Sequence, residues 1–319
     1  MQRTKEIIKQ VRKIEISTKK LVDGIITGNY RSVFKGQGIE FSEIREYNPG
    51  DDIRTIDWKV TARFNHPFIK EFIEERNLRM FFAFDVSGSG SFGNNISKKR
   101  KAIELTASLM FAALRNNDKV GLFLFTDNVE KFIPARKGRR HILKLISHLV
   151  SYEPKSKKTD LNNSLSYVSK VIKKRSILFI ISDFYSPDFS KPLKILRNKH
   201  DTVAINISDL REKEIPDIGL IQLEDEETGE QLLVDTSDSD FRINYINAVK
   251  KAQRKLDFQL RKMKIDVINL LTNEAYEIPL KRFFKIRKQR VVRYWLDLNY
   301  LLFYSFCFYY LFYFIFIKI

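Results

Sequence analysis

The dominant feature of the chain is a regular alternation, after residue 77, of short apolar runs with stretches in which apolar residues recur every three or four positions. Strands are expected at 78–84, 120–125, 177–181, 203–207 and 265–271, and helices at 97–115, 141–150, 161–172 and 192–198 and in the long segment before residue 265. Unbroken apolar runs are typical of strands that are buried on both faces. The series therefore predicts an α/β fold, a Rossmann-like doubly wound and mostly parallel sheet with helices on both sides.

The first 77 residues have a different pattern. Apolar residues at helical spacing among lysines predict an amphipathic first helix that packs on the rest of the chain, namely Ile7, Ile8, Val11, Ile14 and Leu21. The stretch 29–77 mixes glycine, aromatic and charged residues, which indicates short strands and turns. Within it we expect Trp58 in the core and the polar residues between Tyr47 and Trp58 in a network of turns and ion pairs, with a second recognition surface as the alternative.

Two more β segments, 220–223 and 231–234, are expected on either side of the acidic turn 224–230. No internal repeat of solenoid period stands out. The pattern divides the chain into three parts: a small N-terminal helix and β-rich module at 1–77, an α/β domain at 78–280, and a basic segment followed by an apolar aromatic tail at 281–319.

The composition adds charge to this picture. The formal net charge of +18 on 319 residues points to acidic partners, nucleic acid or an anionic membrane surface. The only cysteine, Cys307, excludes a disulfide framework and a thiolate zinc site. Because the charged N-terminus has no apolar signal core, we expect a protein of the cytoplasm.

The strongest candidate for chemistry follows the first strand of the α/β series. The apolar run that begins at Leu78 delivers Asp85, Ser87 and Ser89 to its end. Residues at alternate positions of an extended segment point the same way, so one carboxylate and two hydroxyls can face one small cation. Hard oxygen ligands of this kind suit Mg²⁺.

Ligands of a doubly wound sheet gather at the C-terminal ends of its strands, so partners for Asp85 are expected there. Asp183 ends a central strand, and Thr159 stands at the start of a helix, where its hydroxyl is also a candidate N-cap. Asp127 and Asp160 are alternative acids, but we expect them to be turn or capping carboxylates. With the three residues above, Thr159 and Asp183 complete a set of five oxygen donors.

These residues carry a resemblance. Asp85-x-Ser87-x-Ser89, then Thr159, then Asp183 resembles the metal-ion-dependent adhesion site (MIDAS) of von Willebrand factor A (vWA) domains. The segment from Gly38 to Trp58, with Tyr47-Asn-Pro-Gly-Asp-Asp and Ile-Asp-Trp, resembles the signature of DUF58, a bacterial family that joins this module to an A-type domain.

The resemblance implies a vWA-like domain that holds Mg²⁺, or Mn²⁺ in its place. Ser87 and Ser89 would bind the ion directly, and Thr159, Asp85 and Asp183 would bind it directly or through water. One coordination position would stay open for an Asp or Glu carboxylate of a protein partner. Family members are commonly linked to MoxR-type AAA+ ATPases, which implies an adaptor in the assembly or maturation of other proteins and not an enzyme.

Basic runs at 98–101 and 155–158 lie near the predicted site in the sequence. They either steer an acidic ligand toward the metal or are ordinary solvated charges. The run Arg136-Lys-Gly-Arg-Arg140, with the net charge, leaves nucleic-acid binding as an alternative function. No aromatic residues are interleaved with that run, which disfavours base stacking.

Enzyme functions have less support. The sequence has no P-loop, no G-x-S-x-G elbow and no H-E-x-x-H helix. A metal-dependent phosphohydrolase is the catalytic alternative, but Ser87 stands where its second acid would be. The glycines of 88–93 match G-x-G-x-x-G, yet Asp85 would repel a dinucleotide pyrophosphate.

The tail 300–317 is almost wholly apolar and aromatic. As a helix it would span roughly 27 Å, close to the thickness of a hydrocarbon core. Basic residues at 285–293 would keep the preceding domain in the cytoplasm if the tail were an anchor in the inner membrane. Scattered tyrosines argue against an anchor, which leaves a packed terminal helix or a nonfunctional extension as alternatives.

Overall fold

The structure is a computed structural model that describes residues 2–21, 34, 39–74, 78–88, 97–225 and 227–290. Within these ranges the side chains of 2–5, 19–21, 39–43 and 71–74 are not described. Ser89 and the apolar tail 300–317 lie outside the described residues. Across the described residues, no helix combines the length and the apolar character that a membrane span needs.

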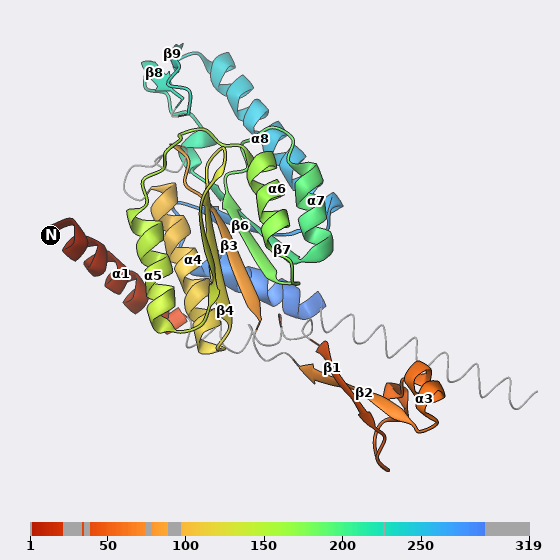
Figure 1. Cartoon of the computed structure of the whole chain (residues 1–319). Coiled ribbons are helices and arrows are strands. Elements are labelled where there is room, and N and C mark those ends of the chain that lie inside the picture. The colour runs from red at the N-terminus through yellow and green to blue at the C-terminus, as the bar shows by residue number, and fades with distance from the viewer. Residues whose placement is uncertain are drawn as a thin grey trace, which may run out of the picture.

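A six-stranded sheet forms the centre of the molecule (Figure 1). Its strands follow the order β10 (Asp266–Leu271), β7 (Asp201–Ser208), β6 (Ile177–Ser182), β3 (Arg79–Asp85), β4 (Lys119–Phe125) and β5 (Val129–Arg136). All neighbours are parallel except β4 and β5, which are antiparallel. The predicted doubly wound, mostly parallel sheet is confirmed.

Strand β5 is the element of the sheet that the sequence pattern did not predict. Its side chains alternate between half-buried and exposed, and Glu130, Lys131 and Arg136 interrupt the apolar positions. An edge strand is covered on one side only, so it needs no unbroken apolar run. For this reason β5 lacks the unbroken apolar run from which the buried strands could be predicted.

Helices cover both faces of the sheet, as predicted. The helices are α1 (Gln2–Leu21), α4 (Lys98–Arg115) and α5 (Arg139–Ser151) on one face, and α6 (Leu161–Val171) and α7 (Ser190–Lys199) on the other. Alternate residues of β3 serve the two layers, because Phe82 and Phe84 join the first core and Phe81 and Ala83 the second. The amphipathic first helix packs against α4 and α5 through residues such as Val11.

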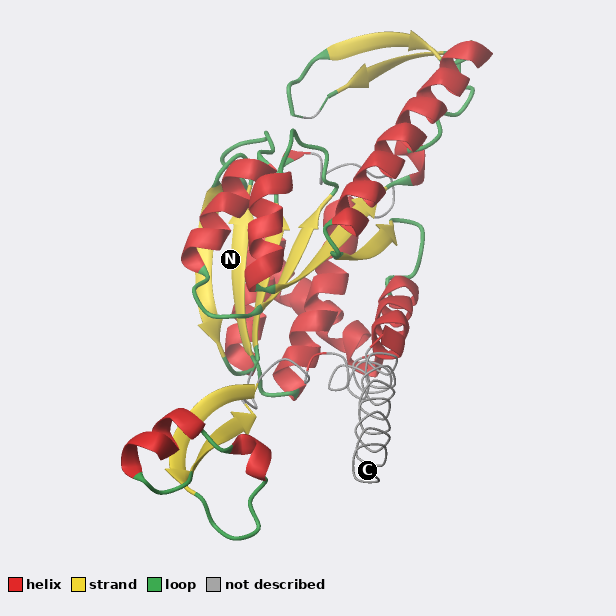
Figure 2. Ribbon diagram, turned by 90° about the vertical axis from the view of Figure 1, so that its right-hand side faces the viewer, coloured by secondary structure: helices red, strands yellow, loops and turns green. Residues whose placement is uncertain are grey.

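The long helix α8 (Ser239–Lys262) follows a separate two-stranded sheet, β8 (Leu220–Glu224) and β9 (Gln231–Asp235), which are antiparallel. Figure 2 shows this β8–β9 hairpin next to α8, beyond the sheet edge at which the parallel strands end. Residues 277–290 form another helix, and its Phe283 and Phe284 are buried in the first core.

The N-terminal module pairs β1 (Ile39–Glu46) with β2 (Phe68–Glu74) in an antiparallel hairpin. Between them lie a 3₁₀ turn, η3 (Ile53–Thr55), and a short helix that was not predicted, α3 (Trp58–Phe64). The side chain of Asp57 caps α3 by accepting the N–H of Lys59. The expectation that Trp58 lies in the core is wrong, because this residue is 68% exposed at the first position of α3, and α3 buries none of its residues against the described part of the chain.

Part of the expected polar network of this module is present. Arg45 donates two hydrogen bonds to Asp51, at 2.8 and 2.9 Å, and the N–H of Asn48 donates to the same carboxylate at 2.8 Å. The hydrogen bonds from Arg45 and Asn48 lower the pKa of Asp51 to about 2. The segment between Tyr47 and Trp58 is thus organised by capping and ion pairing, which are structural tasks.

Strand order also locates the crevice of the sheet. β3 lies between β4, which follows it in sequence, and β6, which the chain reaches only after crossing to the other side. A crevice opens at the C-terminal edge of a sheet where the connections from two neighbouring strands run in opposite directions. Ligands of doubly wound folds bind in this crevice. Asp85 and Ser182 end the two strands at this point.

Gly121 provides a test of packing between the central strands. It pairs with Phe81 across β3 and β4, and a Cβ at this position would lie 2.5 Å from Cε1 of the Phe81 ring. We expect Gly121→Ala to lower the free energy of unfolding by about 1–3 kcal/mol, measured by chemical denaturation. In the double variant Phe81→Leu/Gly121→Ala the loss should be smaller than the sum of the two single losses; strict additivity would contradict the contact.

Candidate functional site

The site begins with Asp85 at the C-terminal end of β3. Its Oδ1 accepts the N–H of Ser87 at 3.0 Å, and its Oδ2 accepts the hydroxyl of Ser182 at 2.7 Å. Burial and, to a smaller extent, the nearby charge of Asp183 outweigh these hydrogen bonds and raise the pKa of Asp85 to about 6. Asp85 is therefore a carboxylate whose negative charge is poorly compensated by the chain around it.

The loop after β3 joins this carboxylate to a second segment. Ser87 is 5% exposed, and the N–H of Gly88 donates to the carbonyl of Lys157 at 3.0 Å. This hydrogen bond holds the loop against the residues that precede Thr159. The structure thus places the loop after Asp85 beside the segment that precedes Thr159.

Thr159 does not cap α6, so that part of the expectation is wrong. The cap is Asp160, whose side chain accepts the N–H of Asn163 at 2.9 Å. A carboxylate accepts from the helix start as well as a hydroxyl does and is favoured by the helix dipole. The capping role predicted for Asp160 is confirmed, and the Thr159 hydroxyl is left for another partner.

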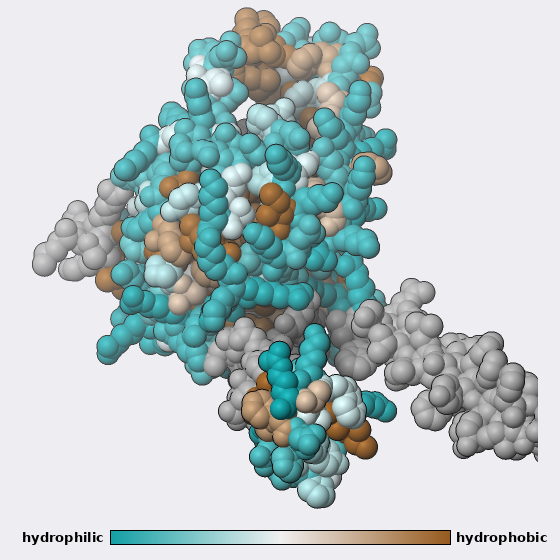
Figure 3. All heavy atoms as spheres, turned by 45° about the vertical axis from the view of Figure 1, so that its right-hand side comes forward, coloured by the Kyte–Doolittle hydropathy of each residue, from teal (hydrophilic) through white to brown (hydrophobic). Residues whose placement is uncertain are grey.

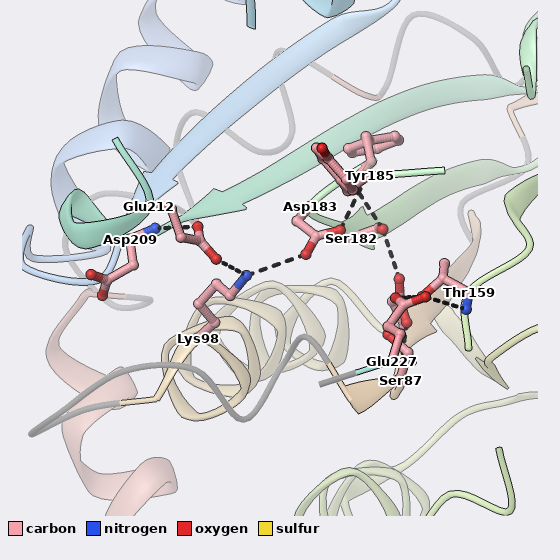
Figure 4. Close-up of polar contacts among 11 residues, drawn as sticks. Ser87, Lys98, Thr159, Ser182, Asp183, Tyr185, Asp209, Glu212 and Glu227 are labelled. Carbon is pink, nitrogen blue, oxygen red and sulfur yellow. Dashed lines mark hydrogen bonds and ion pairs between the residues drawn. The ribbon is translucent and has the colours of Figure 1, made fainter. Parts of the chain in front are cut away.

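That partner is Glu227, from the turn between β8 and β9. The Thr159 hydroxyl donates to Oε1 of Glu227 at 2.7 Å, and the Thr159 N–H donates to Oε2 at 3.1 Å (Figure 4). The resemblance to MIDAS domains implied an open position for a partner's acid. In this structure a carboxylate of the chain itself lies on Thr159.

Glu130 of β5 positions the segment that carries Thr159. Its carboxylate accepts the hydroxyls of Thr126, at 2.7 Å, and of Tyr152, at 3.0 Å, and also the N–H groups of Lys155 and Ser156. Burial raises the pKa of Glu130, but these hydrogen bonds outweigh burial and lower it. An anion of the edge strand therefore holds the loop in place.

Asp183 lies at the end of β6, on the other side of Asp85. Its Oδ2 pairs with the ammonium of Lys98 at 3.2 Å, and its Oδ1 accepts the N–H of Tyr185 at 3.2 Å. Lys98 is 4% exposed and also pairs with Glu212. Burial lowers the pKa of Lys98, but the charges of Asp183 and Glu212 outweigh burial and raise it. Lys98 therefore borders the site as a buried fixed cation.

A small pocket of about 20 Å³ is lined among others by Asp85, Lys98, Ser182 and Asp183, whereas Ser87 and Thr159 do not line it. A volume of this size admits one water or one bare ion. Carboxylate and hydroxyl oxygens with few charges are the donor set of Mg²⁺, which commonly retains several waters. The chemistry of the donors thus fits a small hard cation.

The described ranges contain no group of three or more His, Cys, Asp or Glu residues arranged to hold a metal. The candidate site is of a different kind, since two of its acids, Asp85 and Asp183, are supplemented by the hydroxyls of Ser87 and Thr159. Ser89, the fifth predicted donor, lies outside the described residues.

Some residues of the site were missed by the sequence analysis. Ser182 was given no role, although its hydroxyl donates to Asp85 and accepts the N–H of Phe184 at 3.0 Å. Glu227 was visible only as part of an acidic turn. Glu227 lies 68 positions from Thr159 in the sequence, and no local pattern predicts a contact between residues so far apart.

The basic run 136–140, on which the alternative of nucleic-acid binding rests, makes an ion pair within the protein. Arg139 donates to Glu15 of α1 through two nitrogens, at 2.9 and 2.7 Å. This pair is exposed and connects α5 to the first helix. An arginine held in this way is less available to a phosphate backbone.

Comparison with known proteins gives the family. The sequence matches the family described as "Protein of unknown function DUF58" over residues 43–255. This chain belongs to the DUF58 family. The DUF58 signature that the sequence analysis recognised between Gly38 and Trp58 overlaps the start of the match.

A DUF58 relative is the uncharacterized protein Mb1516 of Mycobacterium bovis, 31% identical over 223 residues, which cover 69% of this chain and 70% of the relative. Among solved structures, BatB of Bacteroides thetaiotaomicron has a TM-score of 0.45 and 13% identity, covering 67% of this chain and 100% of BatB. The SpRpn10 VWA domain has a TM-score of 0.38 and 12% identity, covering 64% and 94%. At these scores the fold assignment rests on the strand order of the DUF58 protein itself.

Proposed function

We propose that this DUF58 protein is a protein-interaction module that depends on a divalent cation. Mg²⁺, or Mn²⁺ in its place, is held at the C-terminal edge of the sheet by Asp85, Ser87, Ser89, Thr159 and Asp183. The observation that supports this proposal most strongly is Asp85, a half-buried carboxylate at the crevice of the sheet with its pKa raised to about 6. A bound cation would supply the missing positive charge.

The contacts divide the ligands by role. Asp85 and the neighbouring hydroxyls of Ser87 and Thr159 face the loops that meet at the crevice, so they are the direct ligands of the proposal. Asp183 is engaged by Lys98 and by the N–H of Tyr185, so it acts on the ion through water. When bound, the metal supplies a positive centre that attracts an anionic ligand.

The ligand of this site is proposed to be the side chain of an Asp or Glu on a protein partner. A metal held by few carboxylates keeps net positive charge, and the chain as a whole carries a formal charge of +18, so an acidic partner is favoured. A MoxR-type AAA+ ATPase is the proposed partner class, on the ground of the DUF58 and MIDAS resemblance, with a role in assembly or maturation of other proteins. The protein is proposed to bind and not to catalyse.

Retention of a MoxR-type ATPase by the full chain tests the proposal. With the ATPase of the same genome co-expressed, tagged full-length protein is expected to retain it in Mg²⁺, to lose it in EDTA and to regain it when Mg²⁺ is restored. The surface variant Asp217→Asn, 59% exposed at its side chain, should behave as wild type. Retention that is unchanged in EDTA would contradict metal-bridged capture, and capture of DNA that falls with salt would favour the nucleic-acid function instead.

A further inference from the structure

Glu227 is placed in the candidate site by the chain itself. Both of its carboxylate oxygens accept hydrogen bonds from one residue, Thr159, and the side chain of Glu227 is half-buried. Other acids of the same turn, such as Glu230, are exposed. One acidic residue of the turn is thus singled out and held against a predicted metal ligand.

The geometry of this contact matches that of two ligands on one ion. Mg²⁺ binds oxygen at about 2.0–2.1 Å in an octahedron, so neighbouring ligand oxygens lie about 2.9 Å apart. Thr159 Oγ1 and Glu227 Oε1 are 2.7 Å apart. The two oxygens can therefore bind one cation at adjacent positions while the hydrogen bond between them is kept.

The turn is built to present Glu227. Oδ1 of Asp225 accepts the N–H of Glu227 at 2.8 Å and of Thr228 at 3.3 Å, and these hydrogen bonds lower the pKa of Asp225. Gly229 then reverses the chain with φ at +72°, a conformation that favours glycine. The N–H of Gly229 donates to the Asp225 carbonyl at 2.7 Å. This local framework fixes where the Glu227 side chain leaves the turn.

The hairpin that carries the turn is weakly attached to the rest. Among the described strands, β8 and β9 pair only with each other, and Leu220, Leu232 and Leu233 on them are more than 60% exposed. Figure 3 shows apolar side chains gathered at this end of the molecule. A two-stranded hairpin with little apolar cover is marginally stable, so it can leave the site at a small energetic cost.

We infer that Glu227 is an internal ligand of the metal site. Resting on the function proposed above, its carboxylate takes the coordination position to which a partner's acid would bind. A partner carboxylate must then displace Glu227, and the affinity of the site for acidic ligands is lowered by the fraction of molecules in which Glu227 is bound. The β8–β9 hairpin thereby regulates capture.

Manganese relaxivity of the full chain tests this inference. Mn²⁺ is titrated into metal-free wild type, Glu227→Gln and the matched control Glu230→Gln, and the longitudinal relaxation rate of water protons is followed. Loss of an internal ligand should leave one more water on the ion in Glu227→Gln, with higher relaxivity and roughly tenfold weaker Mn²⁺ binding. Glu230→Gln should match wild type.

Acetate then serves as a small carboxylate probe. In Glu227→Gln it should displace the extra water and lower the relaxivity at a concentration at least about tenfold below that needed in wild type. Equal relaxivity and equal acetate response in wild type and Glu227→Gln would overturn the internal ligand alone. If Glu230→Gln had the same effect as Glu227→Gln, loss of negative charge in the turn would explain both results, and the internal-ligand inference would be overturned as well. Failure of all three proteins to bind Mn²⁺ would overturn the proposed function together with this inference.

Discussion

Replacing Asp85 with asparagine is expected to abolish Mg²⁺ binding by the full chain, with a loss of affinity of at least about a hundredfold. Asp85 is a half-buried carboxylate at the end of β3, and the groups that donate hydrogen bonds to it, the N–H of Ser87 and the hydroxyl of Ser182, are neutral. An amide keeps a neutral oxygen but removes the charge that attracts the cation. Isothermal titration of Mg²⁺ into EDTA-treated and dialysed protein measures the effect.

The same substitution should leave the fold intact. The raised pKa of Asp85 shows in which direction the substitution changes the stability of the metal-free protein. The folded protein without metal binds the Asp85 proton more tightly than the unfolded chain does, because the pKa of this carboxyl is raised from its ordinary 3.8 to about 6 in the fold. The stability contributed by this group therefore falls as the pH rises from about 4 to about 6, by up to about 3 kcal/mol. Asparagine carries no such charge.

In EDTA at neutral pH, Asp85→Asn should thus be at least as stable as wild type, whereas in Mg²⁺ wild type should be the more stable of the two. Thermal unfolding in both conditions separates these outcomes. Asp127→Asn is the matched control, because Asp127 follows the neighbouring strand β4 and its carboxylate accepts the hydroxyl of Thr126 at 3.0 Å. Tight Mg²⁺ binding by Asp85→Asn would remove Asp85 from the site.

The second large effect is expected at a buried ion pair on the opposite edge of the sheet. Arg287 is 8% exposed, pairs with Asp201 and lies 3.6 Å from Asp266. Its guanidinium also stacks over Phe34, 4.8 Å from the ring centre. Asp201→Asn should lower the free energy of unfolding by about 3 kcal/mol, because the arginine stays buried after its main counter-charge is lost.

Chemical denaturation measures this loss, and Asp217→Asn supplies the comparison. Asp217 pairs with Arg242 at 3.3 Å but is 59% exposed, so its replacement should change stability by less than about 1 kcal/mol. The Mg²⁺ affinity of Asp201→Asn should equal that of wild type, since Asp201 begins β7 at the edge remote from Asp85. If Asp201→Asn and Asp217→Asn lowered the free energy of unfolding equally, burial of Arg287 would not explain the contribution of the Asp201 pair to stability.

The central elements of the fold could be predicted because their signals are local. The sequences of β3, β4, β6 and β7 contain unbroken apolar runs, and each run predicts a strand that is buried on both faces. The edge strand β5 and the exposed helix α3 escaped prediction, since partial cover by the rest of the chain leaves no comparable pattern. Trp58 was misplaced for the same reason: its size favours burial, but the module offers no layer to bury it.

The candidate site was predictable where it depends on position along strands. Asp85 and Asp183 each follow an apolar run, and parallel strands end at one edge, so their proximity could be expected. Ser182, Lys98 and Glu227 could not be given their roles in this way. Their contacts join β6 to β3, α4 to η5 (Leu210–Glu212), and the β8–β9 turn to the segment before α6.

The sequence by itself determined the alternation of strands and helices, the family, and the type of oxygen donors at the end of β3, because each is encoded in residues close together in the chain. The tertiary structure alone decided that Lys98 holds Asp183, that Asp160 and not Thr159 caps α6, and that Glu227 covers Thr159. The physical reason is that hydrogen bonds and ion pairs depend on distances in space. Those distances are set by the packing of the whole chain.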